Sequence, residues 1–151
     1  MRRTFLKFAG VASLAAILAA CASGPKFQEV IAGTPNLKAG EGRIYFFRSS
    51  SMLGAAIQPE IRLNGQVVGN SRPGGFFYLD RPAGNYAASA ATETEKSASF
   101  VLQSGETKYL RTSPSFGIIV GRIVVELESP EKAKAELLSL SYTGGEKTPA
   151  K

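Results

Sequence analysis

One stretch decides the fold class of this chain: Arg43-Ile44-Tyr45-Phe46-Phe47-Arg48. The four residues between the two arginines are β-branched or aromatic, so a strand formed there would have apolar side chains on both faces. Such a strand is stable only when both faces are covered. The stretch therefore predicts a central strand of a sandwich that is buried on both sides.

A hairpin is predicted next. The runs 60–63 and 66–69 alternate, and Asn64-Gly65 lies between them. Both central positions of a two-residue turn favour positive φ, which Asn and Gly adopt readily. Further strands are predicted at 76–80, 85–91, 97–102, 107–112 and 117–128. The strands 97–102 and 107–112 are expected to form a second hairpin around Gly105-Glu106.

The C-terminal part of the chain has a helical pattern. Ser129 is a typical N-cap, Pro130 suits the first helical position, and Glu131 lies in the first turn. Leucines follow at helical spacing, which predicts a short helix from Pro130 to about Leu140. The expected fold is mainly β: a small antiparallel β-sandwich of about seven to eight strands with one short C-terminal helix.

The N-terminal part has the pattern of an export signal. Arg2, Arg3 and Lys7 precede thirteen uncharged, mostly apolar residues at 8–20, a run too short to span a bilayer. The run ends in Leu18-Ala19-Ala20-Cys21, which resembles the lipobox of bacterial lipoproteins. That resemblance implies cleavage between Ala20 and Cys21 and attachment of a lipid anchor to the Cys21 thiol.

Two export routes fit the same residues. Arg2-Arg3-Thr4-Phe5-Leu6-Lys7 resembles the twin-arginine motif, and an ordinary Sec signal can also begin with paired arginines. The residue after Cys21 is Ala22, whereas Asp at that position resembles an inner-membrane retention mark. We therefore expect a bacterial envelope lipoprotein, anchored in the outer membrane and facing the periplasm.

These features divide the chain into four parts. A signal peptide occupies 1–20, a tether 21–41, the β-sandwich with its C-terminal helix 42–140, and a disordered tail 141–151. The tether is predicted because residues 22–41 contain two Pro and three Gly among mixed polar residues. The apolar pair Val30-Ile31 also allows one short strand within it.

Composition argues against several function classes. The chain contains no His and one Cys, so we expect no Ser-His-Asp or Cys-His catalytic site, no metal centre and no cofactor. Its formal charge of +6 includes the three bases of the signal. The remaining fifteen bases against twelve acids leave +3, so nucleic acid is not an expected partner.

The β-rich part resembles the domain-of-unknown-function 2846 family, found largely in small bacterial lipoproteins, over roughly residues 42–138. The resemblance rests on turn and strand signatures: Gly42 to Arg48, Leu63-Asn64-Gly65-Gln66-Val67-Val68-Gly69, Gly75-Phe76-Phe77-Tyr78-Leu79, Pro82-Ala83-Gly84-Asn85-Tyr86 and Ser104-Gly105-Glu106-Thr107-Lys108-Tyr109-Leu110. The family implies no catalytic residue.

We therefore expect a non-catalytic binding module attached to the membrane by its lipid, with a glycan or an envelope protein as ligand. The alternative is a scaffolding or assembly subunit of a larger membrane complex. The aromatic residues could form a binding platform or simply the core, and the arginines an anionic-ligand surface or a solvated face. The aromatic residues are Tyr45, Phe47, Phe76, Phe77 and Tyr78. The arginines are Arg43, Arg48, Arg62, Arg72 and Arg81.

Overall fold

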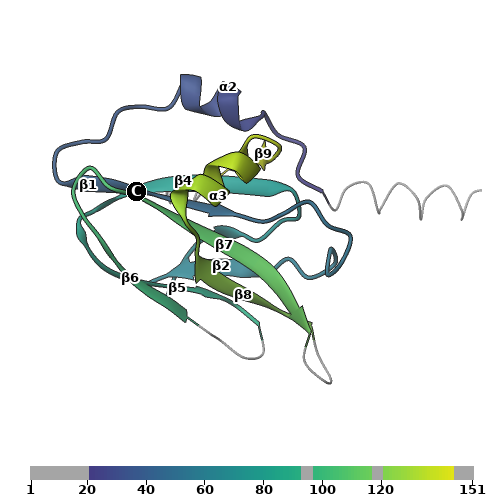
Figure 1. Cartoon of the computed structure of the whole chain (residues 1–151). Helices are drawn as coiled ribbons and strands as arrows, with labels where there is room; N and C mark the ends of the chain where they lie inside the picture. Colours follow the sequence, from purple (N-terminus) through teal and green to yellow (C-terminus); the bar gives the residue numbers. More distant parts are fainter. Residues whose placement is uncertain (1–20, 93–96, 117–120, 145–151) are drawn as a thin grey trace, which may run out of the picture.

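The computed structural model of the chain describes residues 21–92, 97–116 and 121–144. These form two facing β-sheets, and two helices lie on the outer side of one sheet (Figure 1). The five-stranded sheet has the order β8-β7-β1-β4-β9, and the four-stranded sheet has the order β3-β2-β5-β6. The elements are α2 (Phe27–Ala32), β1 (Glu41–Phe47), β2 (Glu60–Leu63), β3 (Gln66–Asn70), β4 (Gly75–Pro82), β5 (Gly84–Ala90), β6 (Ser97–Leu102), β7 (Thr107–Phe116), β8 (Gly121–Leu127), α3 (Pro130–Leu137) and β9 (Ser141–Tyr142).

The predicted central strand is confirmed. β1 lies between β4, to which it is antiparallel, and β7, to which it is parallel. Ile44 and Phe46 point toward the four-stranded sheet, and Tyr45 and Phe47 point to the opposite face. All four side chains are buried. The strand is therefore covered on both sides.

Two apolar clusters share the five-stranded sheet. The cluster between the sheets contains side chains from both of them: Ile44, Phe46, Ile61, Leu63, Val68, Phe77, Leu79, Ala88, Ala90, Phe100, Leu102, Leu110, Ile123 and Val125. The cluster on the outer face lies under α2, α3 and β9 and is largely aromatic: Phe27, Tyr45, Phe47, Phe76, Tyr109, Ala133, Leu137 and Leu140. The predicted sandwich thus has a third layer of helices.

The Asn64-Gly65 hairpin is also confirmed. β2 and β3 are antiparallel, with Leu63 opposite Gln66. The two turn residues have positive φ, 50° at Asn64 and 81° at Gly65. This backbone twist matches that of the flanking strands.

The second predicted hairpin is wrong. β6 belongs to the four-stranded sheet and pairs with β5, whereas β7 belongs to the five-stranded sheet. Gly105 N–H donates to the Glu41 carbonyl at 2.8 Å, and Arg43 N–H donates to the Glu106 carbonyl at 2.8 Å. These bonds hold residues 105 and 106, which follow β6 of the four-stranded sheet, against the start of β1 in the five-stranded sheet. β7 therefore begins beside β1 and runs parallel to it. The five-stranded sheet is consequently mixed, whereas we expected antiparallel pairing throughout.

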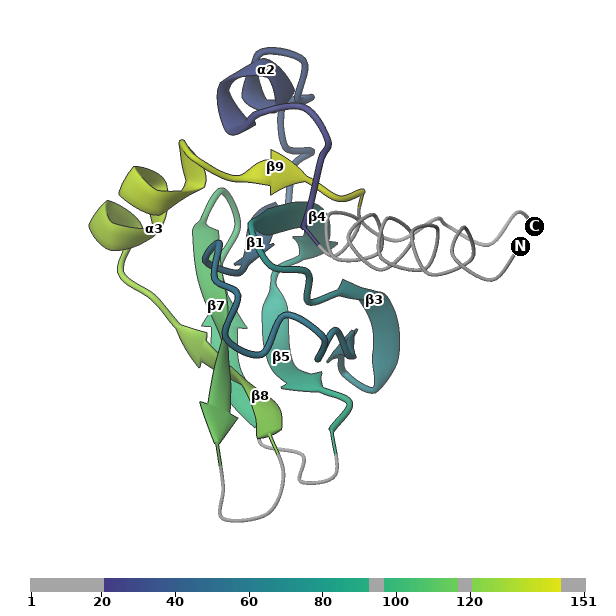
Figure 2. The ribbon, with the colours of Figure 1, turned by 90° about the vertical axis from the view of Figure 1, so that its right-hand side faces the viewer.

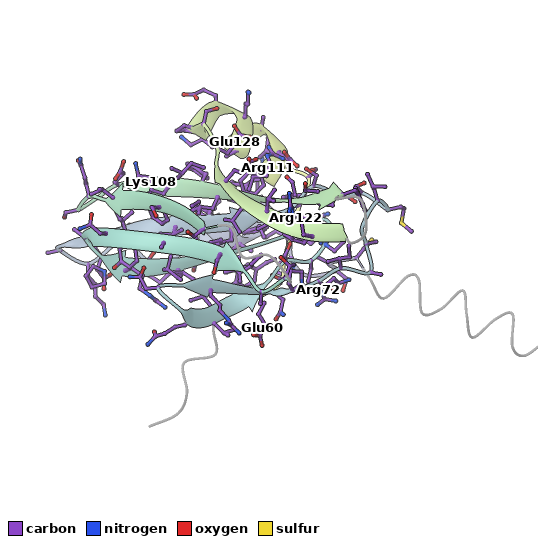
Figure 3. All side chains as sticks on the ribbon, turned by 90° about the horizontal axis from the view of Figure 1, so that it is seen from below. Glu60, Arg72, Lys108, Arg111, Arg122 and Glu128 are labelled. Atoms are coloured by element: carbon purple, nitrogen blue, oxygen red, sulfur yellow. The ribbon has the colours of Figure 1, made fainter. Side chains whose placement is uncertain are left out.

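The C-terminal helix is confirmed as α3, which ends at Leu137. The Ser129 hydroxyl caps it by accepting the Lys132 backbone N–H at 3.4 Å. An ion-pair network fixes the helix to the sheet: Arg111 contacts Glu128 at 2.9 Å and Glu136 of α3 at 2.6 Å. Figure 3 shows Arg111 and Glu128 side by side near α3. A backbone N–H bond from Ser129 and the Arg111 guanidinium hold the pKa of Glu128 below its ordinary value.

The neighbouring leucines of α3 test this packing. Leu137 is fully buried in the outer cluster, and Leu138 is 53% exposed. Leu137→Ala should lower the free energy of unfolding by about 2–5 kcal/mol, because it removes buried methyl groups and leaves a cavity. The matched control, Leu138→Ala, should change it by less than about 0.5 kcal/mol. Urea unfolding of both variants measures the difference, and equal effects would contradict the packing described.

Candidate functional site

The predicted signal residues lie at the start of the chain. Arg2, Arg3 and Ala20 lie outside the described residues. Cys21 is the first described residue, and its thiol is free and half-buried. The prediction of lipid attachment at Cys21 therefore concerns a residue whose position relative to the sandwich is known.

The segment after Cys21 lies against the domain. Ala22 N–H donates to the Pro73 carbonyl at 3.1 Å, and Tyr142 N–H donates to the Pro25 carbonyl at 2.8 Å. The backbone of Gly24 passes so close to Tyr142 that an added Cβ would overlap the Tyr142 carbonyl. The residues following Cys21 are therefore bound to the turn before β4 and to β9.

A helix occurs where we expected a tether. The ring of Phe27 in α2 packs edge-on against Tyr45 at 5.8 Å and Phe76 at 5.4 Å between ring centroids. Burial of a Phe side chain contributes about 1.5–3 kcal/mol, which favours an ordered segment over a free coil. The prediction of a tether relied on the composition of 21–41 alone. It missed the helix because the aromatic residues that bury Phe27 come from strands distant in the sequence.

The same segment also contacts the C-terminal part of the chain. Lys26 Nζ donates to the Ser139 carbonyl at 3.0 Å and to Ser141 Oγ at 3.1 Å. Ser141 and Tyr142 form β9 and pair with the start of β4, although we assigned them to the tail. Residues near the two ends of the described chain thus lie side by side, as Figure 2 shows for the neighbouring α2 and β9.

The arrangement defines one end of the sandwich, which we call the Cys21 end. β1 and β7 finish there, and β4 and β8 begin there. The connection 48–59 between β1 and β2 and the connection 71–74 between β3 and β4 both lie at this end. Ala22 contacts the second of these connections, and this contact places Cys21 beside it.

Arg48 holds the connection 48–59 in place. Its side chain is 2% exposed, and its guanidinium donates to the carbonyls of Ile57 at 2.6 Å and Gly54 at 2.7 Å. It also donates to the Ser71 carbonyl at 3.3 Å, which joins the two connections of the Cys21 end. Burial lowers the pKa of the Arg48 guanidinium from its ordinary value.

Arg43, Arg62 and Arg81 do not form one surface with Arg48. Arg43 forms an ion pair with Asp80 at 2.7 Å, and its guanidinium lies over the Tyr78 ring. Arg62 pairs with Glu60 at 3.5 Å. An anionic-ligand site made from these arginines is therefore not supported.

The aromatic residues belong to the core. Tyr45, Phe47 and Phe76 are buried in the outer cluster, and Phe77 is buried between the sheets. Tyr78 is half-buried and packs against the outer cluster. Of the two interpretations of these residues, the core is confirmed.

A shallow, open hollow of about 450 Å³ lies on the four-stranded sheet. Small side chains create it, because Ala87 is paired with Ser99 across β5 and β6. The Asn64 amide is engaged with the backbone: its carbonyl oxygen accepts Ala87 N–H at 2.8 Å. The residues that line the hollow are uncharged: Asn64, Asn85, Tyr86, Ala87, Ser99, Phe100 and Val101. Such a surface can bind a neutral polar group.

Sequence reasoning missed this hollow. The available signal was the run of small residues at 87–91, which lies within the strand predicted at 85–91. Across the described ranges, no three potential ligands gather as a metal site would require. Nor does any helix of the described part have the length and hydropathy to cross a bilayer.

Arg48 provides a test of how the Cys21 end is built. Arg48→Met should lower the free energy of unfolding by about 2 kcal/mol, because the carbonyls of Gly54 and Ile57 lose their donors. It should also speed cleavage within 49–58 by a protease that cuts at apolar residues. The control, Lys108→Met, removes a partly exposed pair with Glu106 and should cost at most about 1 kcal/mol. Unchanged proteolysis of the Arg48 variant would contradict this role.

Comparison with known proteins agrees with the fold signatures. The chain is 27% identical over 138 residues to an uncharacterized protein of Haemophilus influenzae, covering 88% of this chain and 82% of that protein. No solved structure matches. A family model described as a protein of unknown function, DUF2846, matches residues 38–123, which include β1 to β7 and the start of β8. The chain therefore belongs to the DUF2846 family.

Proposed function

We propose that this protein is a lipid-anchored, non-catalytic binding module of the bacterial cell envelope. The observation that carries the proposal is the succession of a basic start, an apolar run and Leu18-Ala19-Ala20-Cys21. Cleavage before Cys21 and acylation of its thiol would leave the domain attached to the outer membrane and facing the periplasm. Two or more acyl chains hold a protein firmly, since each buried methylene contributes about 0.8 kcal/mol.

The position of Cys21 supports this proposal. It precedes a segment that is hydrogen-bonded to the domain surface, at one end of the sandwich and away from the core. Cys21 belongs to neither apolar cluster, so its acylation would require no rearrangement of them.

The hollow on the four-stranded sheet supports a binding role. Its lining combines uncharged polar groups, such as Asn85 and Ser99, with the apolar surface of Val101. Hydroxyl-rich glycans and peptide backbones have the same mixture of hydrogen-bonding and apolar groups. A neutral polar ligand of one of these two classes fits best.

A scaffolding or assembly role is the second candidate. β3 and β6 are the two edges of the four-stranded sheet. Exposed valines lie on both, Val67 on β3 and Val101 on β6. An edge strand with apolar side chains can accept a strand from another protein.

Cys21→Ser tests the anchor. The variant should appear uncut in the soluble fraction, because serine has no thiol to accept the lipid and cleavage follows lipidation. Ser23→Ala, which alters an exposed neighbour, should remain processed and membrane-bound. Fractionation and intact mass measure both results. A Cys21→Ser protein that is shortened and still in the membrane would contradict the proposal.

The two candidate roles are separated by filling the hollow. Ser99→Leu places a larger side chain in it, and Ser97→Leu makes the same change on the same face of β6 outside it. After crosslinking in intact envelopes, the binding role predicts a retained glycan or peptide that Ser99→Leu alone loses. Recovery of one stoichiometric protein partner by the unchanged protein and by both variants would support assembly instead.

A further inference from the structure

We infer that the Cys21 end of the sandwich is a membrane-contacting surface, which places Met52, Leu53 and Phe116 in the lipid interface beside the anchor. The inference rests on the proposed acylation of Cys21. It adds a second contact with the bilayer and a defined orientation of the domain, neither of which the anchor alone requires.

The first step is the short distance between Cys21 and the domain. Ala22 N–H is bonded to the Pro73 carbonyl at 3.1 Å, and an added Cβ on Gly75 would lie 3.1 Å from the Ala22 Cβ. Consecutive Cα atoms are about 3.8 Å apart, so an acylated Cys21 stays next to the 71–74 connection. The domain surface at that point must then lie at the membrane.

The second step is the apolar pair beside that point. Gly74 N–H donates to the Ser49 carbonyl at 3.2 Å, and an added Cβ on Gly74 would lie 3.3 Å from Ser50 Oγ. Met52 and Leu53 follow within three residues. They are 66% and 62% exposed, more than any other large apolar side chain among the described residues.

The connection that contains these two side chains is held by specific bonds. Ala55 N–H donates to the Met52 carbonyl at 3.1 Å, and Leu53 N–H donates to Ser51 Oγ at 3.1 Å. Arg48 binds the carbonyls of Gly54 and Ile57. The exposure of Met52 and Leu53 is thus a feature of a structured turn.

Phe116 extends the same surface. β7 continues five residues beyond Arg111, which is paired with the last residue of β1, and this adds about 16 Å at the usual rise of 3.3 Å per residue. Phe116 is 55% exposed at the end of this extension. Gly54, which follows Met52 and Leu53, packs closely against Pro114 of β7. This contact joins the end of β7 to the connection that contains Met52 and Leu53.

The charges at this end also suit a membrane containing anionic lipids. The connections 48–59 and 71–74 contain no acid and two arginines, of which Arg48 is buried and Arg72 lies beside the residue bonded to Ala22. Arg72 and Arg122 lie toward one end of the sandwich, where Glu60 at the start of β2 is also found, and Lys108 lies toward the other (Figure 3). Basic residues at a lipid surface are attracted to anionic headgroups. Apolar side chains, basic charge and the anchor thus occur together.

The presence of a single cysteine makes the test direct. Acylation of Cys21 blocks its thiol, so a cysteine introduced by Leu53→Cys is the one site for a polarity-sensitive maleimide fluorophore. The matched control, Gln66→Cys, is exposed at the opposite end, in the β2–β3 hairpin. The full lipid-modified proteins are reconstituted into vesicles of phosphatidylethanolamine and phosphatidylglycerol, with or without nitroxide-labelled lipids.

The Leu53 probe should shift to shorter wavelength on reconstitution, and nitroxide lipids should quench it several-fold more than the Gln66 probe. Equal quenching at both sites in protein that floats with the vesicles would overturn the membrane contact and leave the anchor in place. Protein that does not float, and whose Cys21 reacts with the maleimide, would overturn the anchor and the inference together. A Leu53 probe shifted without nitroxide quenching would indicate a protein partner and would also overturn the inference.

Discussion

β1 has large apolar side chains on both faces, and the rest of the structure depends on covering both of them. One face is covered by the four-stranded sheet through Ile44 and Phe46. The other face has Tyr45 and Phe47, which a single sheet-on-sheet contact would leave in water. Leaving two aromatic side chains exposed is unfavourable, since burial of each one contributes about 1.5–3 kcal/mol to the stability of the fold. The outer cover is therefore an essential layer of the domain.

That cover comes from the two ends of the described chain. α3 contributes Ala133 and Leu137, and α2 contributes Phe27. The use of α2 as cover has a consequence for the proposed anchor. A segment between a lipid and a domain can be long and free, but this one is packed on the sheet and bonded to Pro73 and Tyr142. With Cys21 acylated as proposed, about one residue would separate the membrane from the sandwich, and the packing of the domain would set its orientation.

The polar groups of the domain fall into two kinds. Arg43 and Arg111 have carboxylate partners. Arg43 pairs with Asp80 on the neighbouring strand β4, and Arg111 joins the sheet to α3 through Glu136. Arg48 instead satisfies backbone carbonyls in an irregular connection, where strand pairing supplies no donors. A buried guanidinium with five donors suits that role, because its planar geometry can reach several carbonyls at once. The arginines that looked alike along the chain thus differ in what they stabilise.

The sequence by itself determined the strand-rich class, the two-sided strand at 43–48, the Asn64-Gly65 hairpin and the capped helix that begins at Pro130. Each of these depends on a period or a turn preference within a few residues, and such preferences act locally. Tertiary structure alone decided that β7 pairs in parallel with β1, that Phe27 turns an expected tether into a helix, and that small side chains on β5 and β6 leave a hollow. Tertiary structure also brought the connection 48–59, which contains Met52 and Leu53, against the 71–74 connection to which Ala22 is bonded. The physical reason is common to all four: local patterns show which side chains favour burial, whereas the segment that lies against each of them in the fold is distant in the sequence.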